Sequence, residues 1–409
     1  MFTETIELRG HILDNQTLPR VLDQIVSLGA DYRIDKIDIG HTRKDTSRAR
    51  VTVTAKDDAT LQSVIELIAR SGATQLNRSD AVLESAPRDG VLPDDFYATT
   101  NLATEILIAG RWLRVENAEM DCALVVDKKK KRARCVRMHR VAKGDAVVTG
   151  HAGVRVEAPG RSEGREGAEK EAFGFMGSAV SSEKPKHLVI REIARAIRAA
   201  KKRREKILFV GGPAIVHTGA GPHLEKIIRA GFIDILFAGN ALAAHDIESA
   251  LFGTSLGVSL QSGAPVEHGH EHHLRTINRI RAAGSIAAAV KKGVIPSGIM
   301  RACVEKKIPF VLSGSIRDDG PLPDVIVDMP QAQDAMRALL PGVTLALMVG
   351  TTLLSIATGN MLAASVRTIC VDINPAVVTK LADRGTFQAI GLVTDAELFL
   401  RTLAKELGR

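Results

Sequence analysis

The chain has 409 residues, of which 45% are hydrophobic and 25% charged, so it is long enough for two or three domains with sizeable cores. Its net charge is +8, but only 3% of its residues are aromatic, which favours solvated charge over a nucleic-acid site. No apolar run approaches the roughly 18 residues of a membrane helix, and residues 1–5 begin an alternating strand instead of a signal peptide, so we expect a cytoplasmic protein without a membrane partner.

Much of the positive charge lies in two short runs, residues 128–132 and 201–204. The first is predicted to be the tip of a hairpin, and the second the end of a helix, where cations complement the macrodipole. We therefore expect no nucleic-acid partner. The cysteines Cys122, Cys135, Cys303 and Cys370 form no Cys-x-x-Cys pair, which predicts core thiols in a reducing compartment and no thiolate zinc site.

Residues 1–80 are predicted to form a ferredoxin-like α+β domain. Polar and apolar residues alternate as in strands over residues 3–9, 32–39 and 49–54, whereas residues 18–28 and 61–68 carry helical stripes. The order strand, helix, strand, strand, helix indicates a split β-α-β unit. Such a unit commonly serves regulation or assembly, so its fold alone fixes no function.

The rest of the chain is predicted to hold three further parts. Residues 81–158 are short, alternating and turn-rich, which indicates a small β-rich domain. Residues 159–184 combine glycine and charge and predict a linker or mobile loop. Residues 185–409 alternate helices with apolar strands, which predicts an α/β domain built on a doubly wound parallel sheet. Its expected strands lie near 207–210, 233–238, 310–313, 345–349 and 368–373.

Two glycine-rich turns follow apolar strands in this last domain. Gly211 and Gly212 end one strand, and Gly350 ends another. Such a turn aims backbone N–H groups at an anion, and Asp372, which closes a later strand, is placed to hold a ribose. Either turn alone could be an ordinary βα loop in which glycine supplies a positive φ. Both together, with Asp372, favour a dinucleotide ligand.

The densest group of titratable residues is His268, His270, His272 and His273 with Glu271. Closely spaced imidazoles are common zinc ligands. The pattern is not His-Glu-x-x-His, however, and a helix would place adjacent histidines on different faces. We therefore predict no metal site. A proton-transfer role for His270 or His273 and a purely structural role both stay open.

A second polar group follows an apolar strand end, where open α/β sheets place ligand groups. It consists of Asn240, His245 and Asp246, and Ala238-Gly239 before it leaves the backbone open to a ligand. The alternative is helix capping, with Asn240 at the start of the next helix and Asp246 in its first turns.

Several long strings resemble the archaeal-type ornithine cyclodeaminases. They begin at Gly211, Phe237, Gly269 and Leu312, and shorter matches begin at Gly10 and Gly29. The same family forms the C-terminal part of cyanobacterial arginine-degrading bifunctional enzymes, and its members often carry the label lysine-oxoglutarate reductase/saccharopine dehydrogenase-like. The resemblance covers nearly the whole chain. Residues 157–170 match least well.

The resemblance implies an enzyme that converts L-ornithine to L-proline and ammonia with tightly held NAD, and it implies a homo-oligomer. Hydride would leave Cα of the amino acid and return to the cyclic imine, so the nicotinamide would be regenerated in each turnover. An NAD(P)-dependent lysine-oxoglutarate reductase or saccharopine dehydrogenase, and a non-catalytic module that senses NAD or an amino acid, are the competing interpretations.

The last domain is also distantly similar to the NAD-binding domain of sirtuins and deoxyhypusine synthase. That similarity implies phosphate contacts at both glycine turns and ribose or adenine contacts at the later strand. The candidate cofactor-binding residues are Gly211, Gly212, Thr218, Gly219, Gly221, Gly239, Asn240, Gly350, Thr351, Thr352, Asp372 and Asn374.

Arg317, Asp318 and Asp319 follow another strand and offer paired carboxylates with an arginine. Ornithine has two ammonium groups and one carboxylate, and it needs that mixture of charges, with the arginine as a bidentate clamp. An ordinary Asp-Gly-Pro turn is the alternative. The candidate catalytic residues are therefore Asp318, Asp319, His270 and Arg317.

Overall fold

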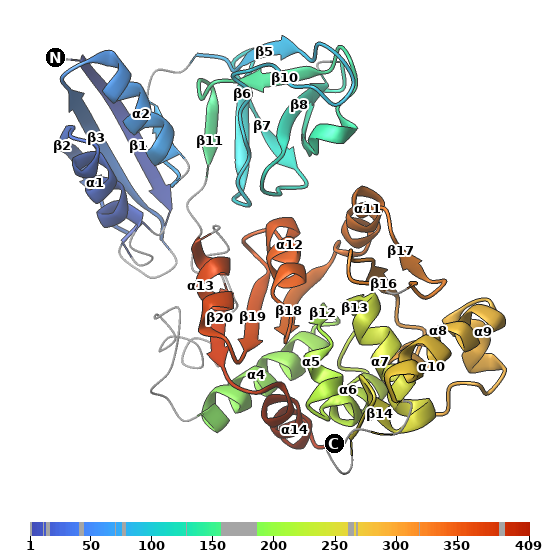
Figure 1. Cartoon of the computed structure of the whole chain (residues 1–409). Helices are drawn as coiled ribbons and strands as arrows, with labels where there is room; N and C mark the ends of the chain where they lie inside the picture. The colour runs from blue at the N-terminus through green and yellow to red at the C-terminus, as the bar shows by residue number, and fades with distance from the viewer. Residues whose placement is uncertain are drawn as a thin grey trace. The chain divides into compact units, whose positions relative to one another are not determined.

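The computed structural model describes residues 2–10, 12–13, 17–40, 45–69, 71–75, 79–127, 129–156, 186–260, 266, 269–318, 320–383 and 389–409 (Figure 1). The chain divides into two compact units. Unit 1 holds Met1–Glu166 and Asn360–Ser365, and unit 2 holds Gly167–Gly359 and Val366–Arg409. The finer division into four parts stays a proposal, and the predicted linker at 159–184 lies outside the described residues.

The N-terminal part of unit 1 is an antiparallel sheet of four strands in the order β2-β3-β1-β4. Its elements are β1 (Phe2–Gly10), α1 (Thr17–Ser27), β2 (Asp31–Asp38), β3 (Ser47–Ala55), α2 (Asp58–Ala69) and β4 (Thr74–Gln75). This is the β-α-β-β-α-β topology of the predicted ferredoxin-like unit. In β3, buried residues alternate with exposed ones, because one face of the sheet covers the core. The two-residue strand β4 is too short to leave a pattern in the sequence.

The rest of unit 1 is a seven-stranded sheet in the order β11-β6-β7-β9-β8-β10-β5. Its elements are β5 (Val82–Ser85), β6 (Thr104–Ile108), β7 (Arg111–Glu116), β8 (Ala123–Asp127), β9 (Arg132–Val136), a 3-10 turn at Met138–Arg140, β10 (Ala146–Thr149) and β11 (Val154–Val156). Strands β8 and β9 pair antiparallel on either side of the first basic run. Residues 129–131 of that run therefore lie at a hairpin tip, as predicted.

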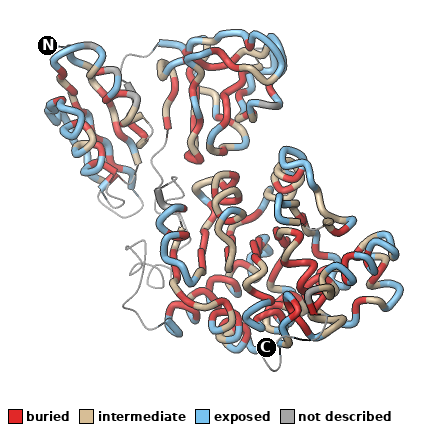
Figure 2. The backbone as a smooth tube through the Cα atoms, viewed as in Figure 1, coloured by how far each residue is buried: buried red, intermediate tan, exposed pale blue. Residues whose placement is uncertain are grey.

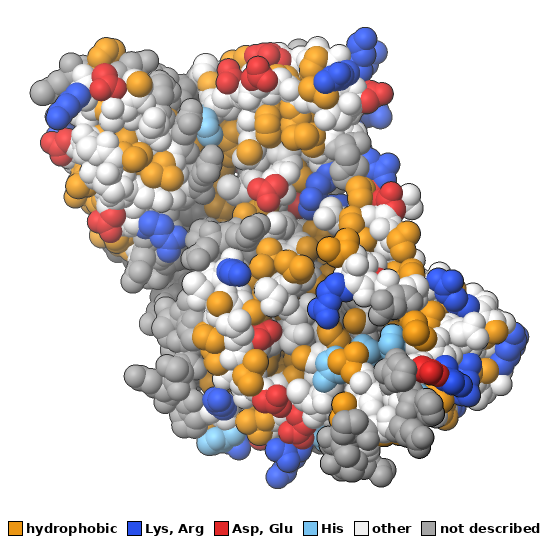
Figure 3. All heavy atoms as spheres, viewed as in Figure 1, with side chains coloured by type: hydrophobic (Ala, Val, Ile, Leu, Met, Phe, Trp, Pro, Cys, Tyr) orange, Lys and Arg blue, Asp and Glu red, His pale blue; other side chains and the backbone are white. Residues whose placement is uncertain are grey.

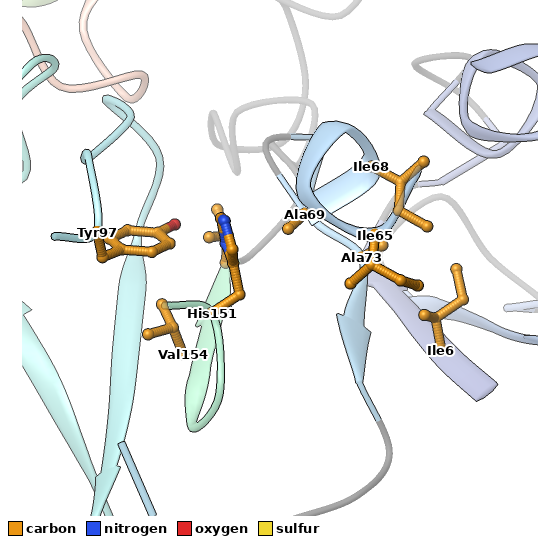
Figure 4. Close-up of a pocket in the computed structure, with 9 residues that line it drawn as sticks. Ile6, Ile65, Ile68, Ala69, Ala73, Tyr97, His151 and Val154 are labelled. Atoms are coloured by element: carbon orange, nitrogen blue, oxygen red, sulfur yellow. The ribbon is translucent and has the colours of Figure 1, made fainter. Parts of the chain in front are cut away.

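Unit 1 also contains a small pocket, shown in Figure 4. Ile6, Ile65 and Ile68 line one side, and Tyr97 and His151 line the other. The Tyr97 and His151 rings meet edge to face, with centroids 5.3 Å apart. A lining this rich in aliphatic groups offers few polar anchors for a metabolite, so we look for the functional site in unit 2.

Unit 2 is built on a seven-stranded sheet in the order β17-β16-β13-β12-β18-β19-β20, in which every neighbouring pair is parallel. The strands are β12 (Lys206–Gly211), β13 (Ile235–Gly239), β16 (Phe310–Ser313), β17 (Val325–Ile326), β18 (Val343–Val349), β19 (Arg367–Asp372) and β20 (Ala389–Val393). Figure 2 shows these strands as mostly buried, as expected of a parallel sheet covered on both faces.

Helices connect these strands, and a two-stranded hairpin, β14 (Thr254–Ser255) with β15 (Val258–Ser259), follows one of them. The helices are α4 (Lys186–Lys202), α5 (Ala214–His217), α6 (Gly221–Arg229), α7 (Asn240–Phe252), α8 (His272–Ala283), α9 (Ile286–Lys291), α10 (Ile299–Glu305), α11 (Met329–Leu339), α12 (Leu353–Met361), α13 (Pro375–Asp383) and α14 (Ala396–Glu406). The second basic run ends α4, as predicted. Among the described residues, no helix is both long and apolar enough to cross a bilayer.

The strand order of unit 2 creates one switch point. From β12 the chain proceeds to β13, β16 and β17 on one side, and it then returns to β18, β19 and β20 on the other side. Strands β12 and β18 are neighbours, and the connections that follow them lead in opposite directions. Ligands of open α/β sheets bind in the crevice beyond the carboxyl ends of such strands. The ends of β12 and β18 are the two predicted glycine turns.

Candidate active site at the carboxyl edge of the parallel sheet

The two glycine turns contact each other at the switch point. The N–H of Gly212 donates a hydrogen bond to the carbonyl oxygen of Val349, 3.1 Å away. A Cβ atom at position 212 would lie only 1.9 Å from the carbonyl oxygen of Gly350. Only glycine fits there, because any side chain would overlap the second turn. The structure therefore joins two motifs that are separated by about 140 residues in the sequence.

The second turn combines a left-handed backbone with the start of a helix. Gly350 has a φ of +62°, and its N–H donates to the carbonyl oxygen of Val371 on β19. Thr351 and Thr352 follow, both partly exposed, before α12 begins at Leu353. The first backbone N–H groups of a nine-residue helix make no bonds within the helix and attract anions. A phosphate group fits this geometry.

Thr218, Gly219 and Gly221 lie one short helix beyond the first turn. The Thr218 hydroxyl donates to the carbonyl oxygen of Ala214 at 2.8 Å, so this side chain caps α5. Gly219 has a φ of +80°, and Gly221 begins α6. These residues shape the connection between α5 and α6, and their contact with a cofactor stays a prediction.

Asp372 ends β19, the neighbour of β18. Its Oδ1 atom accepts a hydrogen bond from the N–H of Asn374 at 2.9 Å, and Oδ1 of Asn374 accepts from the N–H of Ala376. Both side chains thus shape the start of α13. Asp372 is partly exposed at the same edge of the sheet as Gly350, where a ribose next to a phosphate on α12 would lie.

Gly239 ends β13, and Asn240 begins α7. The Asn240 side chain is buried, and its Oδ1 atom accepts a hydrogen bond from the N–H of Leu322 at 3.0 Å. Arg281 fixes the same segment by donating to the carbonyl oxygen of Pro321. Asn240 therefore positions the loop after β16, and this contact lies too far along the chain to be predicted.

The Arg317–Asp318 segment belongs to that loop. Arg317 is exposed and Asp318 partly exposed, while Asp319 lies outside the described residues. The Oδ2 atom of Asp318 accepts a hydrogen bond from the N–H of Ser315 at 2.8 Å, so Asp318 closes a turn. This turn spans residues 315–318, and the Arg317 and Asp318 side chains stay at least partly exposed. The Asp-Gly-Pro turn expected from the sequence includes Asp319 and therefore stays a prediction.

Asp246 serves as a cap, but for a helix other than its own. Its buried carboxylate accepts hydrogen bonds from the N–H groups of Ile299 and Met300, at 2.9 and 2.8 Å, where α10 begins. Burial raises the pKa of Asp246 to about 7, against these two bonds, which lower it. A Cβ atom at Gly298 would come within 2.8 Å of Asp246 Oδ1. Capping was one of the two roles expected from the sequence. The expected cap was for the helix that contains Asp246, whereas the observed cap is for α10.

A buried carboxylate that the sequence analysis missed lies beside His245. The Oε2 atom of Glu248 is 2.8 Å from Nδ1 of His245, one helical turn away on α7. Glu248 is fully buried and also accepts bonds from the Thr254 hydroxyl and the Gly257 N–H. Burial alone would raise the pKa of Glu248, but these hydrogen bonds outweigh it and hold the pKa below its usual value. A His-x-x-Glu spacing after a strand end is the signal that could have revealed this pair.

Three histidine rings converge at this point. The centroids of His217 and His245 lie 4.9 Å apart, and those of His245 and His273 lie 6.4 Å apart. Nδ1 of His217 lies 2.7 Å from the Ser255 hydroxyl on β14. Burial and the neighbouring His245 lower the pKa of His217, against the pull of Glu248. Figure 3 shows histidine side chains on the visible face of unit 2.

The predicted histidine group is only partly described. His268 and the His270 side chain lie outside the described residues. His272 contacts the Thr254 hydroxyl through Nδ1 at 2.9 Å and stacks on Phe252, so its role is structural. His273 approaches His245. Within the described part of the chain, no group of three or more histidines, cysteines or carboxylates has the geometry to hold a metal ion.

Known protein families match three consecutive regions of the chain. Residues 191–403 match the family model described as arginine dihydrolase ArgZ-like, C-terminal, Rossmann fold. Residues 103–190 match the first region of the same C-terminal part, and residues 3–102 match the LOR/SDH bifunctional enzyme conserved region. The ornithine cyclodeaminase of Methanothermobacter thermautotrophicus is 52% identical, over 100% of this chain and 98% of that protein.

The chain belongs to the ornithine cyclodeaminase family.

A further relative and two solved structures are similar to this chain in sequence and fold. The bifunctional arginine dihydrolase/ornithine cyclodeaminase AgrE of Nostoc is 42% identical over 99% of this chain, which matches 58% of that longer protein. A solved LOR/SDH protein of Methanococcus maripaludis is 49% identical, covering 81% of this chain and 99% of its own, with a TM-score of 0.74. A ternary complex of AgrE with ornithine and NAD⁺ is 41% identical over 100% of this chain and 57% of that one, with a TM-score of 0.54.

Proposed function

We propose that this protein is an ornithine cyclodeaminase that converts L-ornithine to L-proline and ammonia with bound NAD, and so makes proline from ornithine. The observation that carries the proposal is the pair of interlocked glycine turns at the switch point of the parallel sheet. Relatives that match the full chain are named for this activity, and a solved relative holds ornithine and NAD⁺ together.

The residues at the switch point fit NAD. Gly212 packs against Gly350 without a side chain, and the N–H groups of both glycines donate within the sheet, so the phosphate contacts fall to the residues that follow the second turn. The first N–H groups of α12 supply the hydrogen bonds, and the partly exposed Asp372 lies one strand away for the ribose hydroxyls. A carboxylate there would repel a 2′-phosphate, which favours NAD over NADP. When bound, NAD takes a hydride from the substrate and returns it in the same turnover.

The loop after β16 supplies the charges that recognise the substrate. In this proposal the exposed Arg317 guanidinium binds the substrate carboxylate through two parallel hydrogen bonds. Asp318 holds an ammonium group with the carboxylate oxygen that does not accept from Ser315. Asn240 on α7 and Arg281 on α8 bind residues 321–322, which follow the charged residues in the loop. These contacts fix the position of that end of the loop.

The test uses the purified protein without any added cofactor. Denaturing it should release NAD⁺ into the supernatant, and intact protein given ornithine alone should form proline and ammonia in equal amounts. NADH absorbance should not grow in the steady state, because the hydride is returned. Sustained NADH production from lysine or saccharopine would establish the competing dehydrogenase reaction. NAD binding without any turnover would establish a sensing module.

We further propose that the protein is a cytoplasmic homo-oligomer. The edge strand β2 supports self-association, because all eight of its residues are exposed, including the apolar side chains of Tyr32, Ile34 and Ile37. In an antiparallel pairing of two copies centred on Ile34, the two Ile34 side chains would lie opposite each other, while Arg33 and Asp35 keep the ion pair that they form within one chain. The cysteines are free thiols, three of them buried, which agrees with a reducing compartment.

A further inference from the structure

The cluster of His217, His245 and Glu248 is not explained by cofactor binding. Its two histidines follow neighbouring strands of the sheet. His217 ends α5, directly after the β12 turn, and His245 lies in the second turn of α7, which begins where β13 ends. Leu242, one turn before His245, lies within 2.8 Å of the Cβ position of Gly211. The cluster thus starts immediately behind the first glycine turn.

The hydrogen bonds of His245 and His217 determine the orientation of each ring and, for His245, which ring nitrogen carries the proton. An ionised Glu248 accepts the Nδ1 proton of His245, so the Nε2 atom of a neutral His245 carries the lone pair. A bond between Nδ1 of His217 and the Ser255 hydroxyl orients the second ring. Within the described part of the chain, Nε2 of neither ring has a hydrogen-bond partner. About 10% of the His245 side chain remains accessible.

Glu248 also holds Thr254 and Gly257 of the β14–β15 hairpin, but those bonds do not require a histidine beside the carboxylate. Burying a charged carboxylate next to an imidazole costs more than burying apolar groups of similar size. The same arrangement, a carboxylate that fixes the tautomer of a histidine, recurs where the histidine transfers protons. The groups that face the His245 ring are His217 from α5, Glu248 from α7 and His273 from α8.

Ornithine cyclisation, which this inference takes from the proposed function, requires removal of two protons. The α-ammonium and the δ-ammonium must each lose one before their nitrogen lone pairs can react. We propose that His245 and His217 form a two-site proton relay that takes these protons, with Glu248 as the positioning residue. In each transfer an N–H bond of the substrate breaks, the electron pair stays on nitrogen, and the proton bonds to Nε2. One proton leaves with ammonia as ammonium, and the other returns to the proline nitrogen, so the relay is restored.

The experiment compares the full-length protein with its His245→Gln, His217→Gln and Glu248→Gln variants. His187→Gln, on the exposed start of α4, is the control. The NAD content, kcat, KM for ornithine and the pH dependence of kcat/KM are measured for each. A ¹⁵N-histidine-labelled sample reports the downfield Nδ1–H proton signal expected of an imidazole bonded to a carboxylate.

The relay predicts that His245→Gln lowers kcat about 100-fold or more, with NAD content, KM and the control unchanged. Glu248→Gln should abolish the downfield proton signal. It should also move the acidic limb of kcat/KM to lower pH, because the carboxylate no longer stabilises the protonated histidine pair. Full activity in both histidine variants would overturn the relay. A variant that loses NAD and folding stability together, with the acidic limb unmoved, would show a structural network instead. Wild-type protein that forms no proline would overturn the relay and the proposed function together.

Discussion

At the scale of single residues, two glycines with the same backbone conformation can have different roles because they lie at opposite ends of one strand. Gly342 and Gly350 flank β18 and both have positive φ values, of +86° and +62°. Any other residue is strained at either position by about 1–2 kcal/mol. Only Gly350, however, lies at the carboxyl edge against the first glycine turn, with its Cβ position 3.1 Å from Cβ of Ala214. Substitutions at these two positions therefore distinguish the effect of backbone strain from an effect on cofactor binding.

We predict that Gly350→Val abolishes detectable NAD binding and that Gly342→Val does not. Both variants are strained by the left-handed backbone, and valine at 350 also crowds Ala214, but only valine at 350 lies where it blocks the approach of the pyrophosphate. Thermal unfolding with and without NAD, together with calorimetric titration of NAD into protein freed of cofactor, checks this. Normal NAD affinity in a folded Gly350→Val protein would remove the turn from the cofactor site.

The residues behind the glycine turns show where reasoning from sequence reaches its limit. The turns at Gly212 and Gly350 were predictable, because residues adjacent in the sequence determine a strand-to-helix turn. The partners of Asn240 and Asp246 were not, because each side chain contacts backbone that lies more than 50 residues further along the chain. The His-x-x-Glu spacing of His245 and Glu248 is visible in the sequence, but the burial of Glu248 depends on its contact with Thr254 of β14, which that spacing does not indicate.

At the scale of elements, long patterned segments were predicted and short strands were not. The predicted strands at 207–210, 310–313 and 345–349 correspond to β12, β16 and β18. Strand β17 has only two residues, and β20 is interrupted by Gly391, so neither produces a clear apolar run. Strand β13 begins at Ile235, two residues later than predicted, because the carboxylate of Asp234 instead binds Lys201 and the N–H of Ile207.

The loop after β16 carries a prediction of its own. Asp318→Asn keeps an oxygen that can accept from the N–H of Ser315, so the turn survives while the negative charge is lost. If Asp318 holds a substrate ammonium group, kcat/KM for ornithine should fall by about 100-fold or more, with NAD binding unchanged. Steady-state kinetics of the variant, beside NAD titration, give the result. Wild-type kinetics in Asp318→Asn would assign this segment to turn formation alone.

At the scale of the whole molecule, the edge strand β2 predicts how copies associate. Ile34→Lys would bring two like charges together on the axis of the proposed pairing, so the oligomer should dissociate into smaller species. Leu188→Lys, which changes an exposed leucine on α4, should leave the mass of the oligomer unchanged. Light scattering after gel filtration measures both. If Ile34→Lys has the mass of the wild-type protein, association uses another surface.

Unit 1 is completed by residues from late in the sequence. The N–H of Met120 donates to the carbonyl oxygen of Asn360, and the N–H of Ala364 donates to the carbonyl oxygen of Asn101. During synthesis, the ribosome must therefore produce about 200 residues after Glu166, where the first part of unit 1 ends, before this unit has all its residues. A nascent chain stopped near residue 190 lacks residues 360–365, so Met120 and Asn101 cannot make these two hydrogen bonds, and unit 1 completes its fold only after most of unit 2 has been synthesised.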